Sequence, residues 1–241
     1  MPSVEEHYNR LLADVYSWMY GGWDAAIARY TEFFMARGIA PRSGKRAIDL
    51  GAGCGFQAIP LARLGFTVTA IDIDRKLLTE LEQHVDGEEI EIVCTDILDF
   101  RGCAPEPAEL IVCMVDTLLH LDSQEAVARL AADVFAALEH GGTFIATFRD
   151  FTVESQELER FIPVRSDEKT IFTCFLEFEP ATVKVHDLVY RRVDGHWDFA
   201  KSFYRKLRLP TAAVIMMLRD AGFAHVETGL DRGLVVLTAT K

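Results

Sequence analysis

Three glycines at alternate positions, flanked by acidic residues, have the clearest chemical meaning in this sequence. The stretch AIDLGAGCGF contains Gly51, Gly53 and Gly55, with Asp49 before them and Asp72 further along. Glycine has no Cβ and tolerates positive φ, so a loop of glycines lets a ligand approach the backbone closely. A carboxylate at Asp49 would repel a pyrophosphate but attract an ammonium or sulfonium group. The signs of these charges favour a cationic ligand at the loop.

A nicotinamide dinucleotide is the alternative ligand for such a loop. Its G-x-G-x-x-G pattern places the pyrophosphate at the N-terminus of the following helix. Here Phe56 stands where the third glycine of that pattern would be, and the spacing is G-x-G-x-G. Together with Asp49, Phe56 disfavours an oxidoreductase. Asp72 is expected at the end of the second strand, where an acidic residue accepts hydrogen bonds from two ribose hydroxyls.

Four motifs, in order, resemble those of the class I S-adenosylmethionine-dependent methyltransferases of the small-molecule type. They are DLGAGCG at 49–55, the acidic strand end at Asp72, CTDILDF at 94–100 and IVCMVDTLLHL at 111–121. The resemblance implies S-adenosyl-L-methionine as cofactor and S-adenosyl-L-homocysteine as product. The cofactor-binding residues that it implies are Asp49, Gly51, Ala52, Gly53, Gly55, Asp72, Ile73, Asp96, Ile97, Met114, Val115 and Asp116.

The resemblance also gives these residues separate roles. Asp96 is expected to hydrogen-bond the adenine amino group, with Ile97 near the ring. Met114, Val115 and Asp116 are expected to line the floor below the reacting methyl group. The structural alternative for Asp96 is a turn residue that caps its own backbone.

His120 and Tyr16 are the candidate catalytic residues. Methyl transfer from a sulfonium is an in-line displacement, so the enzyme mainly supplies proximity, alignment and a dry site. A base is needed only when the nucleophile arrives protonated. His120 follows the fourth strand, at the end of the sheet where ligands bind, and its alternative is a loop histidine. Tyr16 is either a lid residue or helix-face core. Arg149 is expected to pair with a substrate carboxylate or, slightly favoured, with a surface acid.

Composition and missing motifs exclude several functions. The formal net charge of −12 gives no general attraction to nucleic acids or anionic membranes. The sequence after the fourth strand reads DTLL, not the Asn/Asp-Pro-Pro-Tyr/Phe of base methyltransferases, and no residue cluster predicts a metal. Five scattered cysteines form no CxxC pair, which favours a reducing cytoplasm. We expect a cytoplasmic protein with a small-molecule substrate and no nucleic-acid or membrane partner. A homodimer is one option for its oligomeric state, which the sequence leaves open.

The elements that position these residues alternate along the chain. Strands are expected at 46–50, 66–71, 90–94, 109–115 and 143–148, with helices between them. This alternation predicts an α/β fold: a Rossmann-like, doubly wound, mostly parallel seven-stranded sheet. A capping box at Asp122 and Glu125 is expected to open the helix at 123–139, and Gly141 to close it.

A single domain with four parts is expected for residues 1–241. Residues 1–40 form an N-terminal helical cap, with helices at 5–20 and 23–37, that covers the site as a lid or only packs on it. Residues 41–150 form the cofactor-binding core. Residues 165–208 form a small antiparallel insertion after the fifth strand, whose aromatic residues suit a cationic amine. Residues 209–241 form the closing helix and the last two strands, which are expected to continue the parallel pattern.

The sequence therefore predicts a methyltransferase for a small-molecule acceptor, with nitrogen slightly favoured over oxygen. The alternative is a protein that binds S-adenosylmethionine without transferring its methyl group, as a sensor or a repurposed lyase or cyclase. The cofactor motifs are the same in both cases, so the sequence leaves this choice open.

Overall fold

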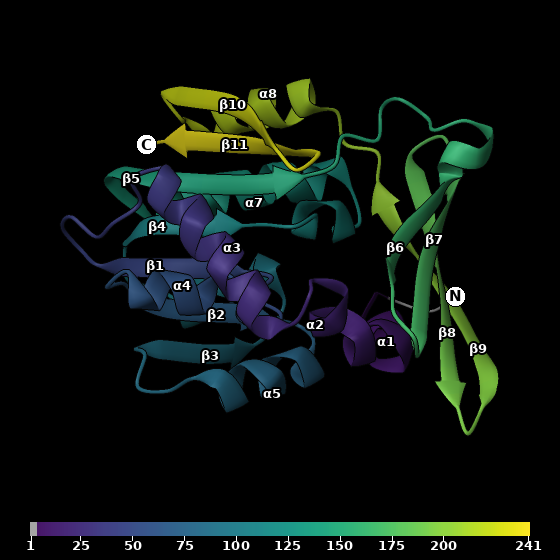
Figure 1. The fold of residues 1–241 in the computed structure, drawn as a ribbon. Helices are drawn as coiled ribbons and strands as arrows, with labels where there is room; N and C mark the ends of the chain where they lie inside the picture. Colours follow the sequence, from purple (N-terminus) through teal and green to yellow (C-terminus); the bar gives the residue numbers. More distant parts are fainter. Residues whose placement is uncertain (1–3) are drawn as a thin grey trace.

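Two β-sheets organise the chain (Figure 1), and the computed structural model describes residues 4–241 of it. The larger sheet has the strand order β10-β11-β5-β4-β1-β2-β3, and the smaller has the order β6-β7-β8-β9. The strands of the larger sheet are β1 (Arg46–Leu50), β2 (Thr67–Asp72), β3 (Ile90–Cys94), β4 (Ala108–Cys113), β5 (Leu138–Phe148), β10 (His225–Asp231) and β11 (Leu234–Thr240). The predicted Rossmann-like sheet of seven mostly parallel strands is confirmed.

The last strand differs from the prediction in direction. β1 to β5 pair in parallel, whereas β11 runs antiparallel to both β5 and β10. β10 and β11 are joined by a short turn at Arg232 and Gly233, both with positive φ. A connection of this length permits only an antiparallel hairpin, because parallel neighbours need a long crossover.

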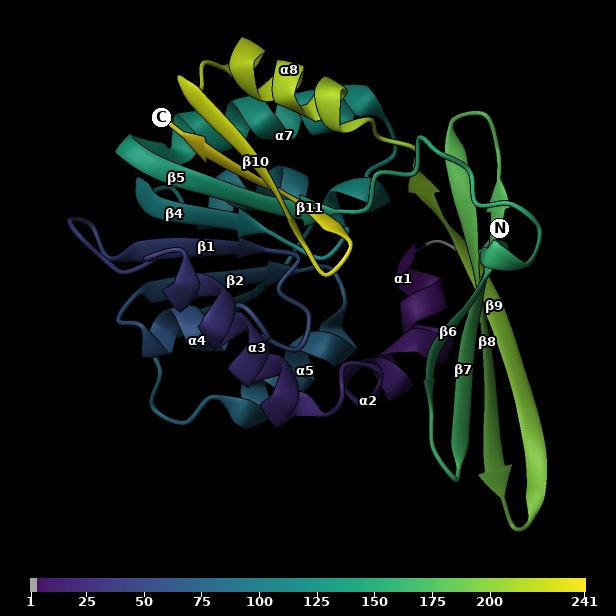
Figure 2. The same ribbon diagram turned by 45° about the horizontal axis from the view of Figure 1, so that its top comes forward.

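Helices cover both faces of the larger sheet (Figure 2). One face packs against α3 (Trp23–Ala36), α4 (Ala58–Arg63) and α5 (Arg75–His84), and the other against α7 (Gln124–Ala137) and α8 (Thr211–Ala221). The short helical turns are η3 (Ile97–Asp99), α6 (Phe100–Cys103), η4 (Thr117–His120) and η5 (Glu157–Arg160). Among residues 4–241, none of the helices has the length and apolar character needed to cross a membrane.

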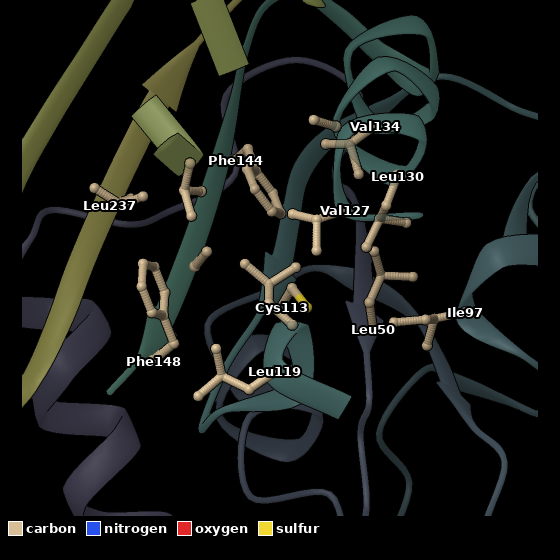
Figure 3. Packing of buried hydrophobic residues seen from close by; sticks show 14 of the residues in the cluster. Leu50, Ile97, Cys113, Leu119, Val127, Leu130, Val134, Phe144, Phe148 and Leu237 are labelled. Atoms are coloured by element: carbon tan, nitrogen blue, oxygen red, sulfur yellow. The ribbon is translucent and has the colours of Figure 1, made fainter. Parts of the chain in front are cut away.

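Strand β4 is buried on both faces, as its almost wholly apolar sequence predicts. Ile111 and Cys113 join the cluster under α7, while Leu110 and Val112 join the cluster under α3 and α4. Figure 3 shows the first cluster, in which side chains of α7 meet aromatic rings of β5. This core fixes the ends of β1 and β4 relative to each other.

The helix start and end expected around 123–139 were wrong. The N-cap is Ser123, whose hydroxyl accepts a hydrogen bond from the backbone amide of Ala126 at 3.2 Å, rather than Asp122. The helix ends at Ala137, and Gly141 lies inside β5 with φ of +79°. The physical reason is that Leu138 already pairs with Ala108 of β4, so the chain becomes a strand directly after the helix.

The N-terminal segment is not the single helix predicted at 5–20. It is a chain of short turns: α1 (Val4–His7), the π-helical η1 (Tyr8–Leu12), the 3₁₀-helical η2 (Ala13–Val15) and α2 (Tyr16–Met19). The segment lies between the two sheets (Figures 1 and 2). Leu11, Leu12 and Val15 pack on Phe172 and Val189 of the smaller sheet. The segment thus packs on both sheets, and these contacts on two sides break the single helix that one apolar stripe would predict.

The insertion has four strands, one more than predicted: β6 (Phe161–Ser166), β7 (Thr170–Phe178), β8 (Thr182–Val193) and β9 (His196–Leu207). All neighbours in this sheet are antiparallel. β6 was missed because it is mostly exposed and has an irregular register between Pro163 and Arg165. Its sequence therefore lacks an apolar alternation.

Candidate active site

A cavity of about 320 Å³ lies at the carboxyl ends of β1 to β4. The glycine loop, the ends of β2 and β4, the turn after β3 and the N-terminal segment line it. Its volume falls in the range of small-molecule sites, and its position is where open α/β sheets bind ligands. The predicted site residues that line it are Gly51, Ala52, Gly53, Asp72, Ile73, Asp96, Ile97, Met114, Val115, Tyr16 and His120. Asp49, Gly55 and Asp116 lie outside this lining.

The glycine loop is a tight turn that only glycine permits at its ends. The amides of Gly51 and Ala52 both donate to the carbonyl oxygen of Ile71, at 2.8 and 2.9 Å. Gly51 has φ of +83°, and a Cβ there would lie 2.5 Å from Thr117 Cγ2. Gly55, also at +83°, is packed so closely that a Cβ would overlap Leu81. Gly55 therefore shapes the loop from behind, without facing the cavity.

Asp72 ties the loop to the end of β2. Its Oδ2 accepts a hydrogen bond from the Gly53 amide, and its Oδ1 accepts one from the Asp74 amide, both at 2.8 Å. Burial raises the pKa of Asp72 to about 6, although the amides of Asp74 and Gly53 act in the opposite direction. Each carboxylate oxygen can accept a second hydrogen bond. Asp72 thus offers acceptors to a ligand in the cavity.

Asp49 is buried behind the glycine loop, with 1% of its surface exposed. Neither of its carboxylate oxygens has a hydrogen-bond partner among the described residues. Burial, followed by the nearby Asp72, raises the pKa of Asp49 to about 8. A buried polar group without a partner is costly and needs an explanation. A cation bound in front of the loop would stabilise the ionised form of this carboxyl.

Asp96 combines the two roles considered for it. Its Oδ1 accepts a hydrogen bond from the Leu98 amide at 2.8 Å and so caps η3. The same residue is exposed to the cavity. The cap holds the carboxylate in a fixed position while its second oxygen stays accessible.

The cavity floor is a strained turn directly after β4. Val115 and Asp116 both have left-handed backbone, with φ of +57° and +69°. Such a conformation costs on the order of 1–3 kcal/mol per non-glycine residue and requires strong local contacts. Thr147 provides two of them: its Oγ1 accepts from the Val115 amide at 2.8 Å, and its carbonyl oxygen accepts from the Asp116 amide at 3.0 Å.

Asp116 does not line the cavity, contrary to the prediction. It is fully buried and pairs with Arg149 and with Lys206, whose Nζ lies 2.6 Å from Asp116 Oδ2. Burial alone would raise the pKa of Asp116, but Lys206 and Arg149 outweigh burial and hold it well below its usual range. The expectation that Arg149 pairs with a surface acid was therefore wrong. The left-handed backbone turns the Asp116 side chain away from the cavity.

His120, Tyr8 and Tyr16 enclose the other end of the cavity. The His120 ring lies 6.0 Å from Tyr8 and 5.4 Å from Tyr204, between ring centroids, and Tyr8 lies 6.0 Å from Tyr16. Burial first, and Lys206 second, lower the pKa of His120 to about 3. Burial raises the pKa values of Tyr8 and Tyr16 well above the ordinary value. At neutral pH this end holds a neutral imidazole and neutral hydroxyls.

The comparisons with known proteins agree with this geometry. Residues 47–142 match the model of the methyltransferase domain family. Residues 47–142 therefore form a methyltransferase domain, and this match supports the class I S-adenosylmethionine-dependent type. A putative methyltransferase of Geobacillus sp. (strain WCH70) is 22% identical over 218 residues, 88% of this chain and 85% of the relative. A ubiquinone biosynthesis O-methyltransferase of Caulobacter sp. (strain K31) is 28% identical, covering 72% of this chain and 73% of its own.

The fold of the methyltransferase also matches solved structures. An amino pentose methyltransferase of Micromonospora echinaspora, solved with bound S-adenosylmethionine, has a TM-score of 0.74 at 14% identity. The match covers 95% of this chain and 96% of the other. At this identity the likeness concerns the fold alone.

S-adenosylmethionine is the cofactor of this methyltransferase, and the residues around the cavity fit it. Gly51 and Gly53 leave the loop without side chains, and Asp72 offers free acceptor positions beside them. The unpartnered carboxyl of Asp49 has the sign that complements the ammonium and sulfonium groups of this cofactor.

Several residues of the methyltransferase site were missed from the sequence. Cys54, in the glycine loop, donates from Sγ to Glu80 Oε2 at 3.0 Å, and Ser17 of α2 hydrogen-bonds the same carboxylate. His7 Nε2 lies 2.8 Å from Asp187 Oδ2, and both residues are buried. No local pattern predicts pairs separated by so many residues. Thr117 also lines the cavity. It directly follows the predicted floor residues 114–116, so its position in the sequence could have identified it.

The insertion contributes less to the cavity than its composition indicates. Trp197 and Phe199 are about half exposed, at 47% and 48%, and lie on the part of β9 near its turn with β8. Tyr204 is buried beside His120. Trp197 and Phe199 therefore form no aromatic wall beside the site. Strand alternation places Tyr204 on the opposite face of β9, which is the face toward His120. Within residues 4–241, no three His, Cys, Asp or Glu residues are grouped as a metal site.

Proposed function

We propose that this methyltransferase acts on the nitrogen of a small amine. The observation that carries the proposal is the state of His120, the only histidine among the residues lining the cavity. Its Nδ1 is buried without a hydrogen-bond partner among the described residues, so no carboxylate orients the ring as a base. Its pKa, lowered to about 3, makes it a weak proton acceptor. A hydroxyl acceptor needs a better base than this, whereas a neutral amine has a free lone pair.

Each cofactor-binding residue has a role in this proposal. The glycines allow the cofactor to approach the loop, Asp72 accepts hydrogen bonds from the ribose hydroxyls, and Asp96 binds the adenine amino group. Ile73 and Ile97 pack against the adenosine part. Asp49 stabilises the positive charge from behind the loop, while Gly55 and Asp116 act indirectly, by fixing the shapes of the loop and the floor.

The mechanism is an aligned displacement in a dry site. When bound, S-adenosylmethionine supplies a methyl group on a sulfonium whose leaving group is a neutral thioether. Met114 and Val115 support the reacting groups from below, and Tyr8 and Tyr16 exclude water from above. His120 hydrogen-bonds the acceptor nitrogen and fixes its direction. The nitrogen lone pair forms the new C–N bond, the S–C electron pair stays on sulfur, and the surplus proton leaves to solvent.

Relatives with both acceptor types support methyl transfer without deciding the acceptor atom. A glycine/sarcosine N-methyltransferase of Aphanothece halophytica, 26% identical over 132 residues, supports nitrogen, and the ubiquinone biosynthesis O-methyltransferase supports oxygen. The preference for nitrogen therefore rests on His120. The net charge of −12 supports a small-molecule substrate over a nucleic acid, and the scattered cysteines support the cytoplasm.

A homodimer stays a prediction. The outer face of the smaller sheet exposes aromatic side chains, including Phe161 and Phe199, at 49% and 48%. Exposed apolar patches mark interaction surfaces in many proteins. Light scattering on the purified protein measures its mass directly: twice the chain mass supports the dimer, and a single chain mass removes it.

Matched acceptors test the proposed function. Purified protein and S-adenosylmethionine are incubated with pairs of small molecules that differ only in carrying an amine or a hydroxyl. Mass spectrometry detects S-adenosylhomocysteine and the methylated product. We expect product from amines only, at a rate that rises with pH as the amine loses its proton.

The outcomes of this assay separate the alternatives. Methylation of hydroxyl partners, but not amines, would contradict the nitrogen preference. Cofactor binding without any S-adenosylhomocysteine would favour a binding protein, sensor or repurposed lyase. His120→Phe, which keeps a ring but no nitrogen, should lower kcat, whereas His140→Phe at the start of β5, the end of the strand away from the cavity, should not.

A further inference from the structure

The strained turn at Val115 and Asp116 connects the floor of the cavity to the glycine loop. Met114, Val115 and Thr117 line the cavity, and Thr117 lies against Gly51 so closely that a Cβ there would be 2.5 Å away. The turn therefore sets the position of the floor and of the loop at once. A shift of the turn would change the space where the methyl group is transferred.

Three groups hold this turn through Asp116. The Arg149 amide donates to Asp116 Oδ1 at 2.7 Å, and the Arg149 guanidinium contacts Oδ2. The Lys206 ammonium donates to Oδ2 at 2.6 Å. Arg149 follows β5 of the larger sheet, and its side chain is about half exposed, at 48%. Lys206 belongs to β9 of the smaller sheet and is buried, at 7%.

Lys206 is not the only contact between β9 and the site. Tyr204 is two residues away, so it lies on the same face of the strand. The Tyr204 ring packs beside His120, 5.4 Å away, in the helical turn η4 that follows Asp116. One face of β9 thus contacts both the turn and the histidine. The insertion reaches the floor of the site without lining the cavity.

We propose that Lys206 is a positioning residue for methyl transfer, because its ammonium group on Asp116 holds the left-handed turn in the geometry that alignment requires. The insertion then contributes to catalysis by placing Lys206 of β9 against Asp116. The inference rests on the proposed function, since its kinetic effect is seen in amine methylation. It assigns Lys206 no contact with substrate or cofactor.

The alternative is that Lys206 only neutralises a buried carboxylate. Lys206→Met keeps most of the aliphatic stem and removes the charge, while Lys206→Arg keeps the charge. Lys201→Met changes an exposed lysine of the same strand and is the matched control. The double variant Asp116→Asn/Lys206→Met removes both charges and leaves no buried carboxylate unpaired.

Steady-state kinetics with the amine that the wild type methylates fastest separate these roles. Misplacement of groups near the reacting atoms costs up to about 100-fold in rate, so we expect kcat of Lys206→Met to fall roughly 10- to 100-fold. The dissociation constant for S-adenosylmethionine, measured by calorimetry, should change less than kcat, because the glycine loop keeps its own hydrogen bonds to the Ile71 carbonyl oxygen. Lys206→Arg should recover most of kcat, and Lys201→Met should equal the wild type.

The double variant decides between positioning and neutralisation. If Lys206 positions the turn, the double variant stays as slow as Lys206→Met. If kcat of the double variant returns to the wild-type value, the lysine only neutralises Asp116 and the proposal is wrong. An unchanged kcat in Lys206→Met also overturns it.

Hydrogen exchange gives a readout that does not depend on turnover. The amides of Val115 and Asp116 should exchange faster in both the single and the double variant, and at the wild-type rate in Lys201→Met. If no amine is methylated by the wild type, the proposed function fails, but exchange still decides whether Lys206 holds the turn. Unchanged exchange at these two amides would contradict the inference.

Discussion

At the scale of single residues, Asp49 is a carboxyl whose position is costly without a ligand. It is buried at 1% exposure, neither oxygen has a partner among the described residues, and its pKa is raised to about 8. A group whose folded-state pKa is raised binds more protons in the folded state than in the unfolded state. The free energy of unfolding therefore falls as pH rises from the ordinary pKa of an aspartate to about 8.

Replacement of Asp49 by asparagine should remove this pH dependence. We expect cofactor-free Asp49→Asn to melt close to the wild type at about pH 5 and several degrees above it at about pH 9, since each kcal/mol changes Tm by roughly 2–4 °C. The variant should also bind S-adenosylmethionine more weakly, because it lacks the negative charge. Thermal melts at both pH values, with and without cofactor, measure this. Asp220→Asn, an exposed control on α8, should show neither effect.

Replacement of Gly55 by alanine should lower the free energy of unfolding more than the same replacement at Gly141, which has a similar backbone conformation. Gly55 and Gly141 have φ of +83° and +79°, but a Cβ would overlap Leu81 at Gly55 and meet nothing within 4 Å at Gly141. Left-handed backbone alone costs alanine about 1–2 kcal/mol. Gly55→Ala should lose a further ~1–3 kcal/mol through overpacking. Equal losses for the two variants in equilibrium urea unfolding would contradict the close packing of the loop.

At the scale of elements, the N-terminal segment joins the two sheets across the cavity. Asp14 pairs with Lys76 of α5, and Trp18 Nε1 donates to Asp167 Oδ2 at 2.7 Å, next to the smaller sheet. Tyr8 and Tyr16 close the cavity between these attachments. We propose that this segment is a lid, which moves when the cofactor enters or leaves.

Cofactor binding should therefore slow hydrogen exchange in this segment. We expect amides of residues 8–20 to become more protected when S-adenosylhomocysteine is added, because the ligand packs against the tyrosines. Amides at the start of the edge strand β10, at the opposite end of the sheet from the cavity, are the internal control and should not change. Equal exchange with and without ligand would show that the segment is fixed core rather than a lid.

The sequence predicts elements well where their pattern is local. The strands of 46–148 carry apolar runs that follow directly from burial, and the glycine loop carries its own backbone signal. β6 and the broken N-terminal segment have no such pattern, because their conformations depend on contacts with distant strands. The same applies to Lys206 and Asp116, which are 90 residues apart and meet only in the folded chain.

At the scale of the whole molecule, we propose that the chain is one cooperative unit, as the sequence analysis expects. Leu176, Val183 and Tyr204 of the smaller sheet belong to the same buried cluster as Leu118 and Phe148 near the site. A shared core should unfold together. Differential scanning calorimetry should give one transition, with equal calorimetric and van't Hoff enthalpies. Two resolved transitions would mean that the insertion folds as a separate domain.

The site residues that could be predicted lie at the ends of neighbouring parallel strands. Asp72, Asp96 and Val115 are far apart in sequence, yet the parallel topology brings the ends of their strands to one edge, so their motifs indicate a common site. The acceptor end could not be predicted in this way. It is built from the N-terminal segment, η4 and β9, which come together through packing that no short motif records.

Calorimetric titration of S-adenosylmethionine into the wild type and Asp72→Ala, with Asp220→Ala as control, tests most directly that this cavity is the cofactor site. The wild type and the control should bind S-adenosylmethionine and S-adenosylhomocysteine but not NAD. Asp72→Ala should bind at least about tenfold more weakly, which corresponds to about 1.4 kcal/mol. Equal affinity in Asp72→Ala, or binding of NAD in place of S-adenosylmethionine, would contradict the account.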